Sequence, residues 1–165
     1  LIYGAYLPLV KARRYITALN TIASVKSLDE LYVHFDRVLL HPSPIGQEEA
    51  VKFLGSDIVN VISAPDQPEP IARALVSYIE PHLFKNNVRH LLMGGQMQII
   101  LWERFGKQEN DLKNAENYYL AARMIGPKLP PVLYPLYDLY GRSDELEKRA
   151  EVRDAIIRYW PDAQL

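Results

Sequence analysis

The sequence predicts an all-α protein in which antiparallel helix pairs stack as a short solenoid of about seven or eight helices, with no sheet. Apolar residues recur three or four positions apart over most of the chain, and no stretch alternates between apolar and polar residues as a half-buried strand would. The 12 prolines stand where helices should begin or end. Ala115 and Ala122 flank Tyr119 ahead of Pro127, which predicts a helix face that packs closely against another helix.

Size and composition allow one self-supporting domain, residues 11–165, and exclude several classes of chemistry. A chain of 165 residues can bury roughly 70% of the surface that its unfolded form exposes. It contains no cysteine, which excludes disulfides, thiolate metal sites and cysteine nucleophiles. Its 19 basic and 20 acidic residues give a net charge of −1, which does not fit a nucleic-acid-binding surface. We therefore expect no nucleic-acid partner.

The chain starts with an apolar segment, residues 1–10, and with Leu1 rather than Met, so we expect a processed piece of a longer protein. The segment is about half as long as a membrane-spanning helix. Lys11, Arg13 and Arg14 follow it, as at a cytoplasmic membrane exit. Two interpretations stay open: the end of a transmembrane helix, or an amphipathic first helix that continues to about residue 25.

Two further helices are expected before residue 64. Ser27 and Glu30 form a capping box, and the helix they open ends at the prolines that follow His41. Ser43 and Pro44 match the cap and the first position of a third helix. The two apolar stripes are Leu28, Leu31, Phe35, Val38 and Leu39, then Val51, Leu54, Ile58, Val61 and Ile62.

Residues 64–70 contain three prolines and mark a break between two sub-bundles. A fourth helix is expected at residues 71–79 and a fifth at about 88–105, each with one apolar face. Gly94 and Gly95 lie inside the fifth helix, where each costs roughly 1 kcal/mol relative to alanine. Such a pair predicts a neighbouring backbone at close range or a kink.

The last three helices surround Pro127. After a turn at residues 106–110, the helix with Ala115 and Ala122 is followed by one in which Pro135 must lie in the first turn or bend the helix. This next helix presents Leu133, Leu136 and Tyr140 at the spacing of a packing face. The final helix, about 144–159, is expected to bury Leu146, Ala150, Ile156, Ile157 and Trp160.

Two regions resemble known families. The residues Ala115, Tyr119, Ala122, Pro127, Leu133, Leu136 and Tyr140 resemble one tetratricopeptide repeat and the start of the next. The run FDRVLLHPSPIGQEEAVKFL, residues 35–54, is similar to the soluble C-terminal tails of O-antigen ligase-like polytopic membrane proteins. This resemblance implies a tail in the cell envelope, anchored by residues 1–10 or released outside the cell. It implies no catalytic residue here, because that family's glycosyl transfer belongs to its membrane segments.

Histidines and carboxylates are the candidates for metal or acid–base chemistry. His34, His41, His82 and His90 form no HExxH or similar motif, so we expect surface or cap positions for them. The acidic candidates, which suit helix N-termini as well as an acid–base pair, are Glu48, Glu49, Glu103, Glu109 and Asp111. We expect no catalytic residue, no metal and no cofactor.

Aromatic rings outnumber what one small core needs, and such rings are enriched at protein interfaces. The candidate interface residues are Leu1, Ile2, Tyr3, Tyr6, Leu7, Tyr134, Tyr137 and Trp160. The preferred hypothesis is a non-catalytic repeat domain for protein–protein association that assembles with itself into an oligomer or filament. Two alternatives stay open: an adaptor tail that recruits another protein to an envelope glycan ligase or polymerase, and a small helical enzyme or ligand-binding regulator.

Overall fold

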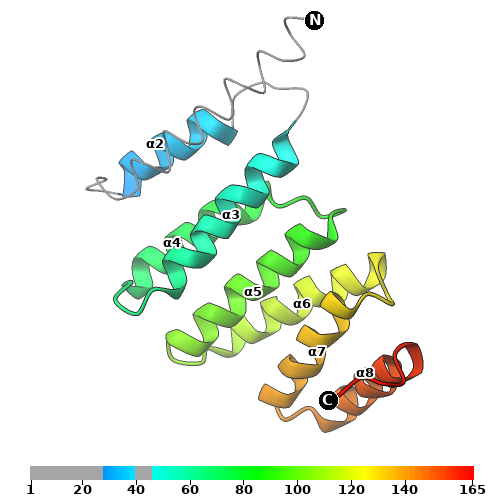
Figure 1. The fold of residues 1–165 in the computed structure, drawn as a ribbon. Helices are drawn as coiled ribbons and strands as arrows, with labels where there is room; N and C mark the ends of the chain where they lie inside the picture. Colours follow the sequence, from blue (N-terminus) through cyan, green and yellow to red (C-terminus); the bar gives the residue numbers. More distant parts are fainter. Residues whose placement is uncertain (1–27, 40–45) are drawn as a thin grey trace, which may run out of the picture. The chain divides into compact units, whose positions relative to one another are not determined.

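The computed structural model describes residues 28–39 and 46–165, and this part of the chain is helical without a strand, as predicted (Figure 1). The chain divides into two compact units, Leu1–His82 and Leu83–Leu165. The elements are α2 (Leu28–Leu39), α3 (Gln47–Ser63), α4 (Glu69–Ile79), the 3-10 helix η1 (Glu80–His82), α5 (Val88–Arg104), α6 (Glu109–Ile125), α7 (Pro130–Arg142) and α8 (Leu146–Tyr159).

The expected first helix lies outside the described residues. So do five of the candidate interface residues, Leu1, Ile2, Tyr3, Tyr6 and Leu7, and the proposed cap Ser27. Within residues 28–39 and 46–165, none of the helices has the length and apolar character that crossing a bilayer requires. Of the proline-rich residues 64–70, residues 64–68 connect α3 to α4 inside the first unit, and the last two begin α4.

In the first unit, α2, α3 and α4 pack against one another. Phe35 and Leu39 of α2 are buried, as the apolar stripe predicts. An aromatic stack joins α2 to α4: the rings of Tyr32 and Tyr78 are nearly parallel with centroids 4.7 Å apart. The Tyr78 hydroxyl donates to Oδ1 of Asp36 at 2.7 Å, and the Tyr32 hydroxyl donates to a backbone carbonyl of α4 at 3.1 Å. The stack therefore fixes the register of α2 along α4.

The start of α3 differs from the prediction. The helix begins at Gln47 rather than at Pro44, and its N-cap is Gly46 in the left-handed conformation with φ 91°. Glycine adopts this conformation without the steric penalty that a Cβ imposes. The predicted cap by Ser43 is therefore wrong, because the turn into α3 depends on Gly46 instead.

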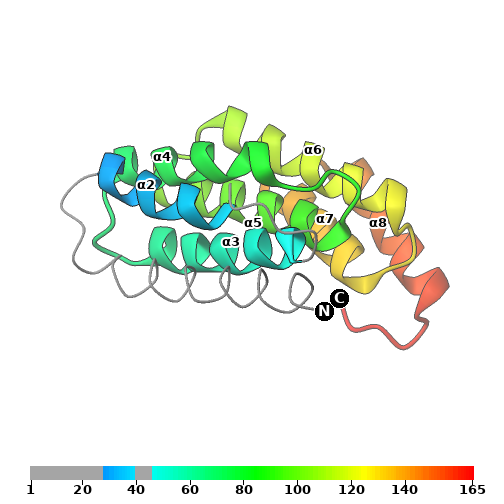
Figure 2. The same cartoon turned by 90° about the horizontal axis from the view of Figure 1, so that it is seen from above.

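In the second unit, α5 packs on α6, α6 on α7 and α7 on α8, which gives two consecutive helical hairpins. Figure 2 shows α5 and α6 side by side, with α7 and α8 following at one end. Helices α3, α5 and α7 each begin a pair of consecutive helices, and they start at Gln47, Val88 and Pro130, about 40 residues apart. This spacing exceeds the roughly 34 residues of a tetratricopeptide repeat.

The contact between α5 and α6 is built on two glycines and two tyrosines. Gly94 and Gly95 are buried in the middle of α5. A Cβ at Gly94 would lie 2.7 Å from Cε1 of Tyr118, and a Cβ at Gly95 would lie 2.2 Å from Cε1 of Tyr119. The glycines therefore make room for two rings of α6. The sequence predicted a close neighbour here, but that neighbour is a pair of aromatic side chains and not a backbone.

The residues of the predicted packing face form the centre of the unit. Ala115 and Tyr119 belong to a core cluster with residues of α7 and α8, and Ala122 belongs to a smaller cluster with Leu91 and Val132. Pro127 lies just after the last residue of α6 and is exposed. The partners of Ala115 and Tyr119 in the larger cluster are Leu133, Leu136, Leu139, Tyr140, Val152 and Ile156.

Pro135, expected in the first turn of its helix or at a bend, lies in the second turn of α7, where its missing N–H removes one hydrogen bond from the helix interior. The burial expected on the last helix is wrong at two residues. In α8, Leu146 is 65% exposed and Ile157 is 44% exposed, although both were predicted to be buried. The buried residues of α8 are Val152 and Ile156, four positions apart. Ile157 lies about 100° around the helix from Ile156 and therefore faces outward.

Ion pairs link the two hairpins of the second unit. Arg142 of α7 pairs with Glu103 of α5, and Arg123 of α6 pairs with Glu151 of α8 at 3.1 Å. Exposed pairs of this kind contribute about 0–1 kcal/mol each. One pair joins α5 to α7, the first helices of the two hairpins, and the other joins α6 to α8, the second helices. The apolar cluster supplies most of the stability.

We expect Gly95→Ala to lower the free energy of unfolding by roughly 1–3 kcal/mol, because the new Cβ overlaps the Tyr119 ring. Helix propensity alone would favour alanine by about 1 kcal/mol, so a loss of stability would show that the clash with the Tyr119 ring outweighs propensity. Gly141→Ala is the matched control, because its Cβ meets the flexible end of Arg149 at 3.1 Å or more. Thermal and urea unfolding should show a destabilised Gly95 variant and a neutral or stabilised Gly141 variant.

Replacing Ala122 with Leu should overpack the contact of α6 with its neighbours and cost roughly 1–3 kcal/mol. Ala122 has no exposed surface, so the larger side chain has no space to occupy. Asn114→Leu, on the exposed side of the same helix, should change stability by less than about 0.5 kcal/mol. Equal melting temperatures for both variants would contradict this packing.

Candidate functional site

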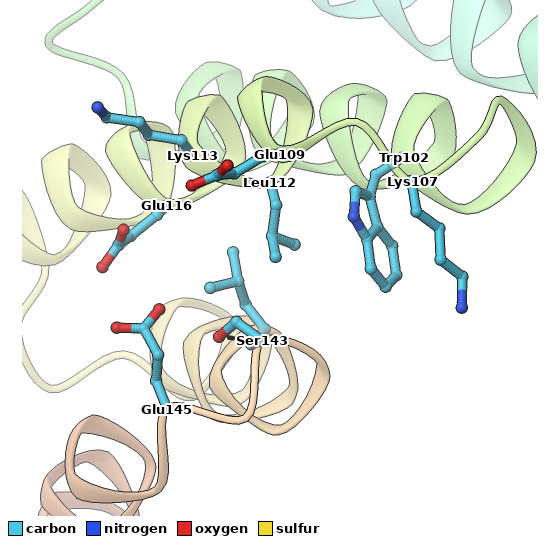
Figure 3. Close-up of a pocket in the computed structure, with 9 residues that line it drawn as sticks. Trp102, Lys107, Glu109, Leu112, Lys113, Glu116, Ser143 and Glu145 are labelled. Atoms are coloured by element: carbon cyan, nitrogen blue, oxygen red, sulfur yellow. Dashed lines mark hydrogen bonds between the residues drawn. The ribbon is translucent and has the colours of Figure 1, made fainter.

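The second unit contains a hollow at the end where α5 finishes, α6 begins and α7 turns into α8. Its volume is about 590 Å³. Figure 3 shows its lining side chains. We call this site the α6 hollow, and it is lined by Trp102, Lys107, Glu109, Leu112, Lys113, Glu116, Leu139, Ser143 and Glu145.

The apolar part of the hollow comes from three helices. Trp102 stands in the last turn of α5, Leu112 in the first turn of α6, and Leu139 near the end of α7. The turn between α5 and α6 positions Lys107 beside the indole: Gly106 and Lys107 both have positive φ, and the Lys107 N–H donates to the Trp102 carbonyl at 3.1 Å. The Lys107 ammonium consequently lies 5.2 Å from the centroid of the Trp102 ring.

The acidic part of the hollow is held by hydrogen bonds. The Glu116 carboxylate accepts from the Tyr140 hydroxyl at 2.9 Å and from Lys148 at 2.8 Å. Lys148 also pairs with Glu145 at 2.6 Å, so one ammonium bridges two carboxylates of the lining. Figure 3 shows Glu116 and Glu145 turned toward each other, with Lys107 and Lys113 extending away from the middle of the hollow.

These contacts keep the charges of the site in place near neutral pH. The hydrogen bond from Lys148 lowers the pKa of Glu145, and a hydrogen bond from Ser143 acts in the same direction. The two carboxylates raise the pKa of Lys148 in turn. Glu145 is therefore ionised at pH 7 and carries no proton that it could donate as a general acid.

The arrangement combines partly exposed apolar surface with hydrogen-bonded carboxylates. The half-buried side chains of Trp102 and Leu112 supply the apolar surface, Leu139 is buried behind them, and carboxylates stand beside them. Tryptophan is among the residues that most often dominate binding energy at protein interfaces.

No histidine lines the α6 hollow. His90 is buried in the first turn of α5, where its Nδ1 accepts the Phe84 N–H at 3.1 Å. It thereby satisfies a backbone donor ahead of α5, next to the N-cap Asn87. His82 is half-buried with its ring 5.7 Å from that of Tyr78. His41 and the side chain of His34 lie outside the described residues.

The acidic candidates are spread over three helices. Glu48 and Glu49 are exposed in the first turn of α3, and Glu103 pairs with Arg142. Glu109 lines the α6 hollow, and Asp111 is buried in the first turn of α6. In the described part of the chain, no three histidine or acidic side chains are placed to share a metal ion.

The described candidates for an interface pack against the unit's own core. Tyr134, Tyr137 and Trp160 are half-buried beside the cluster that contains Leu136. The Arg149 guanidinium covers Tyr137, with its Cζ 4.4 Å from the ring centroid. The structure thus places these rings on the core, where each exposes part of its surface.

Sequence patterns did not identify the α6 hollow. Trp102 lies within the helix expected at about 88–105, and Glu116, Ser143 and Glu145 are ordinary polar residues in their local sequence. The hollow forms where the α5–α6 hairpin contacts the α7–α8 hairpin, and no short-range sequence pattern predicts this contact. The one available hint was a tryptophan five residues ahead of a lysine in a glycine-containing turn.

The chain was compared with known proteins at three levels. No protein family, no curated protein and no solved structure matches it.

Two buried tyrosines, Tyr119 and Tyr140, and the half-buried Tyr78 predict alkaline unfolding. Burial is the main cause that raises the pKa of Tyr78, Tyr119 and Tyr140. Hydrogen bonds to carboxylates raise the pKa of Tyr78 and Tyr140 further. Because the folded-state pKa lies above the unfolded value of 10.0, their stabilisation is complete below pH 10 and is lost as the pH rises further.

Tyrosinate absorbance and circular dichroism, followed together from pH 8 upward, test this expectation. Tyr78, Tyr119 and Tyr140 should ionise last, at the pH at which helix content falls. Tyr119→Phe should remove part of the absorbance change at that pH. Complete tyrosine ionisation with intact helices would contradict it.

Proposed function

We propose that this chain is a non-catalytic helical-hairpin domain for protein–protein association, and that the α6 hollow is its contact site. The observation that carries the proposal is the hollow itself: Trp102 stands at its wall, with Glu116 and Glu145 beside it. The preferred form is association of the chain with itself into an oligomer or filament. Recruitment of a different protein is the alternative.

The contacts of the hollow favour binding over chemistry. Glu116 is held by Lys148 and Tyr140, and Glu145 by Lys148, so the positions of both carboxylates are fixed before a partner binds. Preset side chains lose little conformational entropy on association, which raises affinity. Aromatic residues are also enriched at protein interfaces, which have a polar rim.

The surface of α8 limits how copies could stack. Its exposed side includes Glu147, Glu151, Arg153, Asp154 and Arg158. A charged outer face is typical of the capping helix at the end of a repeat array. Self-association is therefore better supported through the hollow than through face-to-face stacking on α8.

The family resemblance gives a biological setting for the proposal. If residues 35–54 mark the tail of an O-antigen ligase-like membrane protein, the domain would act in the cell envelope, either as a released assembly or as an adaptor. The association chemistry of the hollow is the same in both settings.

Sedimentation velocity of the 165-residue chain over a wide concentration range tests the proposal. We expect the average mass to rise with concentration, and Trp102→Ala combined with Glu145→Lys to weaken association by more than about 30-fold, as the loss of hot-spot contacts does. Glu147→Lys makes a similar charge change on the exposed side of α8 and should leave the mass unchanged.

A chain that stays monomeric throughout would contradict self-association. In that case, hollow-dependent capture of a short peptide with alternating leucine and lysine would support the adaptor alternative. Identical behaviour of all variants with that peptide would exclude the hollow as a binding site.

A further inference from the structure

We propose that Arg149, on the hairpin of α7 and α8, binds the carboxylate of an aspartate or glutamate side chain of a partner protein. The guanidinium of Arg149 is held in place, and no carboxylate of the chain pairs with it. This site is additional to the α6 hollow, because neither Arg149 nor the two residues that hold it, Tyr137 and Gly141, line the hollow.

The guanidinium of Arg149 contacts a ring and a glycine that fix its position. Its Cζ lies 4.4 Å from the centroid of the Tyr137 ring, and Tyr137 packs against the core cluster of the unit. A Cβ at Gly141 would lie 3.1 Å from Cζ and 3.2 Å from Nε of Arg149, so the absence of a side chain at Gly141 leaves room for the guanidinium. An arginine that is stacked in this way is pre-organised and loses little freedom when it forms hydrogen bonds.

The guanidinium has no acceptor within the chain. Its Nε is buried without a hydrogen-bond partner. Among the described residues, no carboxylate forms an ion pair with Arg149. The other segments, residues 1–27 and 40–45, contain no aspartate or glutamate. The chain therefore supplies a positioned cation and leaves its pairing to another molecule.

The two Nη atoms of Arg149 are open to a ligand. Nε is the atom of this guanidinium that is buried without a partner in the described part of the chain; Nη1 and Nη2, which accept no partner there either, are not buried. Two N–H donors that lie side by side in one plane match the two oxygens of one carboxylate. The guanidinium therefore presents the geometry of a bidentate carboxylate site.

The neighbouring carboxylates of the hairpin face other directions. Burial is the main cause of the raised pKa of Tyr119, and the charge of Asp138 adds to it, which places Asp138 on the side of α7 that faces α6. Glu147 precedes Arg149 by two residues, which is about 200° around α8. Neither carboxylate occupies the place of the proposed ligand.

The charge of the site favours a carboxylate over a phosphate. Arg153, one turn further along α8, is paired with Asp154 at 2.9 Å. The unpaired cation of this part of the hairpin is therefore Arg149 alone, and one carboxylate neutralises it. Phosphate groups on proteins are recognised by clusters of arginines instead.

The aromatic residues beside Arg149 favour a protein as the source of the carboxylate. Tyr134 is three residues before Tyr137, on the same face of α7, and both rings expose part of their surface. Tyrosine and arginine are enriched at protein interfaces and among the residues that dominate their binding energy. A protein segment with an acidic side chain has apolar atoms next to the carboxylate that can contact these rings.

Two short capped peptides test the inference with the full chain. One has a glutamate between two leucines, and the other has glutamine in the same place. Fluorescence anisotropy of the labelled peptides measures their affinity. We expect saturable binding of the glutamate peptide and binding of the glutamine peptide that is weaker by about tenfold or more, because hydrogen bonds to a charged acceptor are the stronger ones.

Arg149→Lys keeps the charge and removes the planar fork, so it should weaken binding of the glutamate peptide by about tenfold. Arg153→Lys is the matched control, because Arg153 is exposed on the same helix and already paired with Asp154. It should bind the glutamate peptide like the original chain. Circular dichroism and thermal unfolding establish that both variants fold.

Selective binding of the glutamate peptide that Arg149→Lys loses and Arg153→Lys keeps would support the inference. Absence of binding at millimolar peptide, equal binding of the two peptides, or equal affinity of the Arg149→Lys variant would overturn it. Competition with inorganic phosphate and with acetate tests the chemical class: displacement of the peptide by phosphate at a lower concentration than by acetate would overturn the assignment to a carboxylate.

Discussion

The packing of two tyrosines of α6 onto two glycines of α5 is the contact on which the second unit depends. The rings of Tyr118 and Tyr119 occupy the space that Cβ atoms at Gly94 and Gly95 would fill. Each glycine lowers the helix propensity of α5 by about 1 kcal/mol, so the contact must return more than it costs. Tyr119, with Ala115, also joins the cluster with α7 and α8, so this one helix holds the unit together.

The position of α6 also creates the surface that carries the functional proposal. Its start, with α5 and the connection from α7 to α8, encloses the α6 hollow. Ion pairs between the hairpins, such as Arg123 with Glu151, help to keep the helices in register. Packing at the centre of α6 therefore positions the residues that line the hollow.

The sequence predicted the helical class and most helix positions, because apolar periodicity and proline placement are local signals. Ala115, Tyr119 and Ala122 were found from their spacing, and all three are buried. Burial on α8 was predicted less well, since Ile156 and Ile157 are adjacent and equally apolar, and the partner helix alone decides which one is buried. The hollow was missed because Trp102, Glu116 and Glu145 come together only through the contact of two hairpins.

The most direct test of this account is a double-mutant cycle between Gly95 and Tyr119, measured as the free energy of unfolding in urea. With Tyr119 present, Gly95→Ala should destabilise the protein because its Cβ meets the ring. With Tyr119→Ala in place, the ring is gone and the same Gly95→Ala change should stabilise the protein by up to about 1 kcal/mol through helix propensity. A change of sign is the result we predict, and an equal effect of Gly95→Ala in both backgrounds would contradict the account.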